Sequence, residues 1–267
     1  MKALLLAGGQ GTRLRPLTDD RPKPMVEIGG EPAIAHALRW LGRQGVTEVA
    51  INLHAHPDVL RAYVGDGARF GLHVTYSFEP QILGTSGALR PLYDFFRAED
   101  AFVVLYGDVF TDLDFGPVRR AHTASGADAT LVLTRVEDPT RAGIVAFDRD
   151  HRIARLVEKP AADAVFSDWA NAGIYYCGPA VLQYVAAHGA QDFARDLFPA
   201  MLRDGRHLLA SPTSALVIDF GSPERLELAR RNAERGARNA EHGHSDRSAF
   251  PVPHSALGRG MAGGGGC

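Results

Sequence analysis

Short apolar segments alternate with helical patterns through the first half of the chain, and this alternation constrains the fold more than any other feature. The apolar segments have the length of buried parallel strands and cover residues 2–7, 47–53, 72–78 and 101–106. Patterns typical of helices lie between them, at residues 32–44, 58–64 and 85–96. Strands and helices that alternate in this way predict an α/β fold with a doubly wound, mostly parallel, Rossmann-like sheet.

The carboxyl ends of these predicted strands are the expected place for a ligand. Right-handed crossovers put the loops that follow the strands along one edge of the sheet. Ligands of open α/β sheets bind at that edge. The first strand runs into a loop that contains Gly8, Gly9 and Gly11, and the fourth strand ends at Gly107-Asp108. We therefore expect the glycine loop and Asp108 to face a common crevice.

The second half of the chain is richer in strand patterns. They cover residues 129–135, 143–148, 152–158, 170–176, 207–210 and 215–219, with helices near 179–187 and 223–235. We expect these elements to extend the same mixed sheet and to form the far wall of the crevice. Residues 1–125 and 126–235 would then be two halves of one domain. No internal repeat is found, and no β-helix domain is expected.

Residues 236–267 form a segment of different composition. Gly, Ser, His, Arg and Pro dominate it, and its apolar residues have no helical or strand period. Such a segment buries too little apolar surface to offset the entropy of ordering. We expect it to be a disordered tail.

Composition and charge narrow the possible partners and the compartment. The net charge is −2, so the chain has no global basic field for nucleic acid or an anionic membrane. No apolar stretch approaches the length of about 18 residues that a membrane span needs. The two cysteines, Cys177 and Cys267, allow no disulfide framework or zinc spacing, which suits a reducing cytoplasm. The amino-terminal apolar run lacks a cleavage pattern and favours a buried strand over a signal peptide.

The glycine loop has the composition of an anion-binding site. Glycines let consecutive backbone N–H groups approach a phosphate, and Arg13 adds a fork of donors. The loop is not a P-loop, because Gly11 is followed by Thr12-Arg13. It is not a dinucleotide fingerprint either, because Leu14 stands where glycine is required. On composition alone, a plain strand-to-helix turn remains open.

A stiff segment follows the glycine loop, in which Pro22 and Pro24 flank Lys23. The two prolines restrict the backbone to extended conformations, so the lysine would be held in place at reduced entropic cost. A solvated surface lysine is the alternative, since most lysines are exposed.

Together these segments, GGQGTRLRPLTDDRPKPM, resemble the opening motif of the nucleotide-diphospho-sugar pyrophosphorylases. This family consists of nucleotidyltransferases with a GT-A-like fold, in which the loop wraps an NTP. The resemblance implies catalytic roles for Arg13 and Lys23. It implies nucleotide contacts for the loop residues Ala7, Gly8, Gly9, Gly11 and Thr12.

Later motifs match the same family. The segment LGTSGAL resembles the part that contacts the base, which implies roles for Gly84, Thr85 and Gly87. The resemblance makes Asp108 and Asp219 the ligands of Mg²⁺. It also implies a sugar-phosphate site of Gly143, Glu158, Lys159 and Asn171.

Glu158 and Lys159 are adjacent, so an extended strand would point their side chains to opposite faces. Both can serve one ligand only if the strand ends there, and Pro160 supplies that break. An exposed ion pair without a role in binding is the alternative.

The resemblance implies a cytoplasmic enzyme whose partners are an NTP and a sugar 1-phosphate, with Mg²⁺ as cofactor. LGTSGAL is similar to the guanylyltransferases that act on mannose or heptose 1-phosphate. Uridylyl-, thymidylyl- and cytidylyltransferases of the same family remain open, and so does a non-catalytic regulatory paralogue that senses nucleotide sugars. Whether the chain forms a homo-oligomer also remains open.

Overall fold

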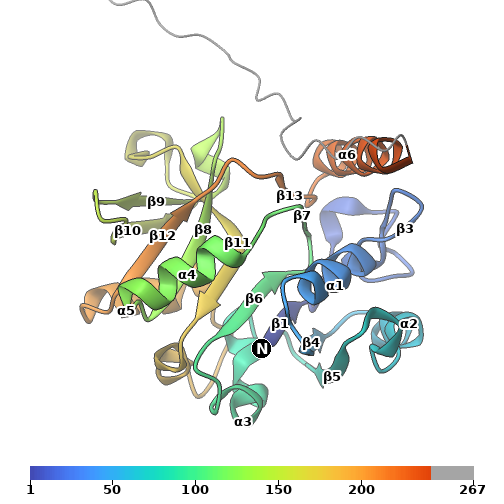
Figure 1. The fold of residues 1–267 in the computed structure, drawn as a ribbon, viewed down its shortest axis with the longest axis horizontal. Helices are drawn as coiled ribbons and strands as arrows, with labels where there is room; N and C mark the ends of the chain where they lie inside the picture. The colour runs from blue at the N-terminus through green and yellow to red at the C-terminus, as the bar shows by residue number, and fades with distance from the viewer. Residues whose placement is uncertain (242–267) are drawn as a thin grey trace, which may run out of the picture.

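A nine-stranded mixed sheet forms the centre of the molecule in the computed structural model, which describes residues 1–241 (Figure 1). Four neighbouring strands are parallel to one another, as predicted: β6 (Phe102–Tyr106), β1 (Lys2–Leu6), β4 (Glu48–Leu53) and β5 (His73–Phe78). The antiparallel strand β11 (Trp169–Cys177) joins this part to the second half. Beyond it lie β9 (Gly143–Phe147), β10 (Ile153–Glu158), β8 (Ala129–Arg135) and β12 (Leu208–Pro212).

Two apolar cores cover the two faces of this sheet. Along β1, Ala3 and Leu5 belong to one core and Leu4 to the other, because successive strand residues point to opposite faces. The first core includes side chains of α1 (Ala33–Arg43), α2 (Pro57–Val64) and α4 (Gly116–Ser125). The second includes side chains of α3 (Tyr93–Phe96), the π-helical turn η8 (Phe193–Leu197) and α5 (Phe198–Arg203). Helices on both faces confirm the predicted doubly wound α/β fold.

A third, smaller core lies beside the main sheet and fixes the segments that surround the glycine loop. It joins Leu14, Val26 and Ile28 to Phe220 and Leu226. Leu14 ends the 3₁₀ turn η1 (Thr12–Leu14), Ile28 belongs to strand β2 (Glu27–Ile28), and Val26 directly precedes that strand. Leu226 belongs to helix α6 (Pro223–Glu241), and Phe220 lies between β13 (Val217–Asp219) and α6. The third core therefore ties the beginning of the chain to residues far along it.

Several predicted elements differ from those observed. The segment 85–96 is mainly a 3₁₀ helix, η4 (Gly87–Leu92), because Pro91 has no N–H for an α-helical bond. The segment 179–187 is likewise 3₁₀, as η7 (Pro179–Tyr184). Strand β7 (Val109–Thr111) and helices α4 and α5 were not predicted. Two further short elements are β3 (Glu31–Pro32), which pairs with β2, and η2 (Lys23–Met25). The remaining 3₁₀ turns are η3 (Ala68–Phe70), η5 (Pro139–Arg141) and η6 (Ala162–Ala164).

The predicted start of the tail at residue 236 is wrong. Helix α6 continues to Glu241, so residues 236–241 are helical. Its sequence from Glu224 onward is rich in Glu, Arg and Ala, which favour helix even where little apolar surface is buried. The rest of the predicted tail, residues 242–267, lies outside the described residues.

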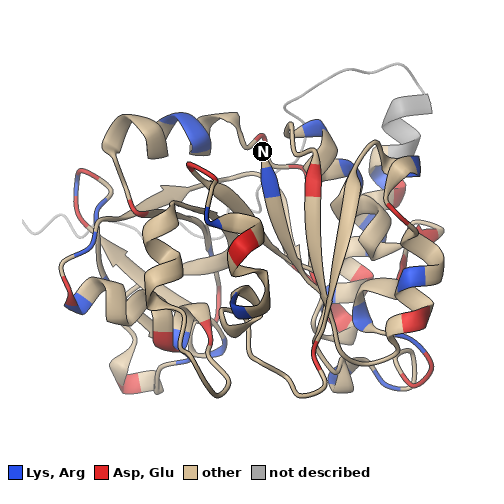
Figure 2. Cartoon of the chain, turned by 90° about the horizontal axis from the view of Figure 1, so that it is seen from below, with Lys and Arg blue, Asp and Glu red and all other residues tan. Residues whose placement is uncertain are grey.

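Charged residues of both signs are interspersed over both halves of the molecule (Figure 2). This distribution agrees with the net charge of −2 and with the expectation that no global basic field exists. In the described part of the chain, no helix combines the length and the apolar character that crossing a membrane requires.

Candidate active site

Two aspartates from distant parts of the sequence meet beside the carboxyl end of β6. Strand β7 follows Asp108 and pairs with β13 so that Asp219 lies opposite Val109. The backbone N–H of Phe220 donates to the carbonyl of Asp108 at 2.9 Å and continues this pairing. The register of the β7–β13 ribbon thus places the predicted metal ligands Asp108 and Asp219 next to each other.

The ammonium group of Lys23 lies between these two carboxylates. It forms an ion pair with Asp108 and lies 3.8 Å from Oδ1 of Asp219. Lys23 begins the turn η2, and its side chain is only 11% exposed. The neighbouring Pro24 packs close to Gly107. The structure therefore excludes the alternative of a solvated surface lysine.

Arg13 belongs to the same cluster. Gly221 shows this, because a Cβ atom built on Gly221 would lie 2.8 Å from Asp219 Oδ1, 2.9 Å from Arg13 Nη2 and 3.1 Å from Lys23 Nζ. Gly11 turns the loop in the left-handed conformation, with φ of +65°, and η1 then presents exposed Thr12 and Arg13. Hence Arg13, Lys23, Asp108 and Asp219 form one charged cluster, although they come from four separate segments.

The two carboxylates repel each other. Desolvation at the strand end and the neighbouring Asp108 raise the pKa of Asp219, while Lys23 and Arg13 act in the opposite direction. The Asp219 side chain is 60% exposed, so water moderates this effect. Its Oδ1 also accepts a hydrogen bond of 2.7 Å from the N–H of Gly221, which fixes the direction of the carboxylate.

The residue types of this pair of carboxylates suit a divalent cation such as Mg²⁺. Among residues 1–241, no group of three or more His, Cys, Asp or Glu side chains could hold a metal by itself. Mg²⁺ usually takes only one or two protein carboxylates and completes its shell with water and phosphate oxygens. Asp108 and Asp219 both face the ammonium group of Lys23, and a divalent cation beside them would relieve their repulsion.

The loop expected to contact the base is held against the second half of the chain. Gly84 has φ of +78°, and its position leaves no room for a side chain beside the backbone of Gln191. The N–H of Gly87 donates to the carbonyl of Gln191 at 3.0 Å. Thr85 donates from both its N–H and its hydroxyl to Asp192 at 3.1 Å. The loop that contains Gly84, Thr85 and Gly87 therefore has a defined shape.

The four residues predicted for the sugar phosphate lie together. A Cβ atom on Gly143 would lie 2.5 Å from Oε2 of Glu158 and 3.7 Å from Cβ of Asn171. Strand β10 ends at Glu158, as predicted, and Lys159 turns the chain with φ of +47°. Its Nζ is 3.5 Å from Glu158 Oε1, and the Lys159 side chain remains 61% exposed. The charged groups of Glu158 and Lys159 thus lie side by side, and the ammonium group of Lys159 remains accessible to a ligand.

A partly buried network that the sequence did not reveal orients Asn171. Its amide donates to the Tyr175 hydroxyl at 2.6 Å and accepts from the N–H of Gly173 at 3.0 Å. The Tyr175 hydroxyl lies 3.3 Å from that of Tyr106, two residues before Asp108. Burial raises the pKa of both tyrosines, so they remain neutral hydrogen-bonding groups. The network connects Asn171, one of the residues predicted for the sugar phosphate, to strand β6, which ends beside the charged cluster.

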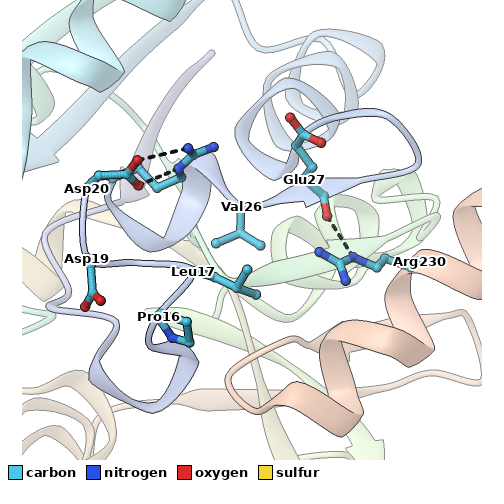
Figure 3. Close-up of a pocket in the computed structure, with 8 residues that line it drawn as sticks. Pro16, Leu17, Asp19, Asp20, Val26, Glu27 and Arg230 are labelled. Atoms are coloured by element: carbon cyan, nitrogen blue, oxygen red, sulfur yellow. Dashed lines mark hydrogen bonds and ion pairs between the residues drawn. The ribbon is translucent and has the colours of Figure 1, made fainter.

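A cavity of about 500 Å³ lies away from these clusters, between the segment that follows η1 and helix α6 (Figure 3). Leu17, Asp20, Glu27 and Arg230 are among the residues that line it. Arg230 donates to the carbonyl of Glu27 at 3.1 Å across one side. None of the predicted site residues lines this cavity, so the charged cluster, and not this hollow, is the candidate active site.

Comparison with known proteins identifies the family of this chain. The family model described as nucleotidyl transferase matches residues 2–235, and the chain belongs to that family. A mannose-1-phosphate guanyltransferase of Neurospora crassa is 37% identical over 228 residues, which cover 84% of this chain and 62% of that protein. The UTP–glucose-1-phosphate uridylyltransferase of Synechocystis is 33% identical over 254 residues, which cover 90% of this chain and 66% of that protein. The chain thus spans under two thirds of the length of these two relatives.

A solved structure extends the comparison to the whole fold. The crystal structure of a candidate glucose-1-phosphate thymidylyltransferase from Bacillus anthracis, in complex with a sucrose, superimposes with a TM-score of 0.79. The two sequences are 29% identical, and the match covers 87% of this chain and 95% of that one.

Proposed function

We propose that this chain transfers a nucleotidyl group from an NTP to a sugar 1-phosphate and releases pyrophosphate. The single observation that supports this most is the convergence of Arg13, Lys23, Asp108 and Asp219 beside the glycine loop. Two cations and two carboxylates at this place suit a reaction between two phosphates that repel each other. Residues 1–125 would bind the NTP, and residues 126–235 the sugar phosphate.

In the proposed reaction, a phosphate oxygen of the sugar 1-phosphate attacks the α-phosphorus of the NTP in line. The bond from that phosphorus to the bridging oxygen breaks, and pyrophosphate leaves with its electron pair. Arg13 and Lys23 would offset the negative charge of the NTP phosphates, and Lys159 that of the sugar phosphate. Glu158 would accept hydrogen bonds from sugar hydroxyls, and Asn171 would donate with its remaining N–H. Direct displacement needs no protein nucleophile.

Asp108 and Asp219 would hold Mg²⁺, which neutralises phosphate charge and orients the triphosphate when bound. The observation in favour of this assignment is that both carboxylates face one cationic group and repel each other.

GTP and mannose 1-phosphate are the proposed first substrates to test. The similarity to the guanyltransferase of Neurospora crassa supports this pair, and so does the motif LGTSGAL. UTP with glucose 1-phosphate is the second pair, since the Synechocystis relative is named for that reaction.

The experiment is a matrix of GTP, UTP, CTP and dTTP against mannose, heptose and glucose 1-phosphates. Pyrophosphate release and the mass of the NDP-sugar are both measured, with and without Mg²⁺. Turnover that needs Mg²⁺ with at least one pair would support the proposal. Binding of NDP-sugars without any turnover would instead favour the regulatory paralogue.

A further inference from the structure

A row of side-chain hydroxyl groups joins the loop expected to contact the base to a residue expected to contact the sugar phosphate. The Tyr175 hydroxyl accepts from the amide of Asn171 at 2.6 Å and donates to the Tyr106 hydroxyl at 3.3 Å. Burial raises the pKa of Tyr106, and its hydrogen bond with the side chain of Thr85 acts in the opposite direction. The Thr85 hydroxyl donates to the carboxylate of Asp192 at 3.1 Å. These five side chains form one hydroxyl relay.

The hydrogen bonds of the hydroxyl relay all run in one direction. The amide oxygen of Asn171 accepts from the N–H of Gly173 at 3.0 Å, so the amide nitrogen is the atom that donates into the relay. Each hydroxyl then has one proton to pass on, and the relay ends on a carboxylate, which can only accept. Hydrogen bonds in such a series polarise and strengthen one another, so the loss of one hydroxyl weakens the whole series.

A bulge in strand β11 brings the members of the relay together. The register of β11 against β8 shifts between Asn171 and Tyr175. Within this bulge, Gly173 has φ of +71°, and a Cβ atom there would lie 3.0 Å from Cγ of Tyr106. The bulge therefore leaves room for the Tyr106 ring beside Asn171, and bulges near active sites commonly redirect side chains in this way.

We propose that Tyr106 and Tyr175 are positioning residues, which hold the base loop (Gly84, Thr85 and Gly87) and Asn171 in a fixed place relative to each other. The role rests on the proposed function, in which these two parts hold different substrates. In-line attack requires the phosphate oxygen of one substrate about 3 to 3.5 Å from the α-phosphorus of the other. A relay between the two parts limits the drift of one substrate relative to the other. Its loss should therefore slow the chemical step more than it weakens the binding of either substrate alone.

Tyr106→Phe is the decisive variant, because it removes only the hydroxyl in the middle of the relay. Thr85 keeps its hydrogen bonds to the second half of the chain, and Asn171 keeps its hydrogen bond to Tyr175. We therefore expect the Kd of the NTP alone and that of the sugar 1-phosphate alone to stay within about twofold of the wild type. The single-turnover rate at saturating substrates should fall by about 5- to 20-fold, since a misplacement of 1 Å can cost about 100-fold.

Tyr175→Phe interrupts the same relay one bond further on and also removes an acceptor of Asn171. Its single-turnover rate should fall at least as far, with weaker binding of the sugar 1-phosphate. Because the two hydroxyls act in series, the double variant should be no more than about twofold slower than the slower single variant. Tyr176→Phe is the matched control and should match the wild type, because Tyr176 lies on the same strand and packs against Phe115 on the other face of the sheet.

The assay uses GTP and mannose 1-phosphate first, and then the pair that the substrate matrix identifies. Titration calorimetry with Mg²⁺ gives the Kd of each substrate alone. Single turnovers, with the protein in excess over the NTP, give the rate of the chemical step. Thermal unfolding of each variant shows the share of any loss that follows from lower stability.

Three results would overturn this role. The first is a single-turnover rate of Tyr106→Phe within about twofold of the wild type. The second is a loss in that variant that consists wholly of a higher Kd for one substrate alone, since that would show direct contact with that substrate. The third is a double variant whose loss is the product of the two single losses, since the two hydroxyls would then act independently.

Tyr106 is only half-buried, so Tyr106→Phe remains a test even if Tyr175→Phe does not fold. A failure of the proposed function is a separate result. It would appear as a wild-type chain that turns over no pair of substrates, whereas an active wild type with an equally fast Tyr106→Phe variant refutes only the relay.

Discussion

One methyl group at Gly221 should disable the charged cluster without removing any charge. In Gly221→Ala, the new Cβ would lie 2.8 to 3.1 Å from Asp219 Oδ1, Arg13 Nη2 and Lys23 Nζ. Non-bonded heavy atoms prefer a separation of roughly 3.5 Å or more, so these three side-chain atoms must move away from the new Cβ by about 0.4 to 0.7 Å. This displacement of the Asp219 carboxylate also weakens the hydrogen bond that it accepts from the N–H of residue 221.

The expected cost falls on catalysis and not on folding. All three displaced atoms are side-chain ends, so the loss of stability should be about 1 kcal/mol, as for off-rotamer side chains. A misplacement of 1 Å can reduce rates by about 100-fold. Three charged groups displaced by about half that distance should together lower kcat by about 30- to 100-fold. This loss corresponds to about 2 to 3 kcal/mol of transition-state stabilisation.

The assay is steady-state pyrophosphate release at saturating substrates, together with thermal unfolding. Gly42→Ala is the matched control, because its Cβ in α1 would make only ordinary contacts, at 3.6 Å and beyond. A Gly221→Ala variant with kcat within about twofold of the wild type would refute the inferred cluster. So would a variant in which the whole loss of activity follows from unfolding.

Four other variants test the remaining parts of the structure. Asp108→Asn should lower turnover by about 100-fold or more at any Mg²⁺ concentration, and near-normal activity in Mg²⁺ would contradict its role as a ligand. Lys159→Ala should raise the KM of the sugar 1-phosphate by about 10-fold or more and leave that of the NTP unchanged, with Glu158→Gln weaker in the same direction. Burial lowers the pKa of His122 below its ordinary 6.5, so the unfolded chain takes up a proton more readily and stability should fall as the pH drops below 6.5. The melting temperature of His122→Gln should depend less on pH in that range, and an equal dependence would show that other groups cause it.

The parallel half of the fold could be predicted because its signals are local. The apolar runs that became β1, β4 and β6 are buried on both faces, so they can be recognised without an alternating pattern, and the run that became β1 ends in glycines. The edge strand β5 differs, since most of its residues are exposed or half-buried. Helix α4 escaped detection because its apolar stripe is thin, with only Val118 and His122 buried. The 3₁₀ form of η4 depends on Pro91, which the apolar period of that segment concealed.

The sequence could predict which residues belong to the candidate site, but not which of them are in contact with one another. The residue types of the charged cluster follow from short motifs. That Asp108 and Asp219 are neighbours follows from the register of β13 with β7, a strand of three residues that the sequence did not predict. Asn52 and Glu79, two buried polar residues joined by a hydrogen bond of 2.9 Å, lie outside the family motifs. The one available signal was Asn52 itself, a polar residue inside the apolar run that became β4.

Glycines at this site show why sequence alone leaves such contacts open. Gly11 and Gly84 have positive φ, so their backbone conformation explains the residue type. Gly143 and Gly221 do not, and each instead leaves room for a charged group of another segment, the carboxylate of Glu158 or the cluster of Asp219, Arg13 and Lys23. Gly9 has no atom within 4 Å of its would-be Cβ, so it is left open toward any phosphate that the loop binds. These three uses of glycine look alike in the sequence, and only the position of the other segments distinguishes them. Because Gly143 and Gly221 each leave room for charged side chains of other segments, they mark the two places where the proposed reaction would hold its phosphates.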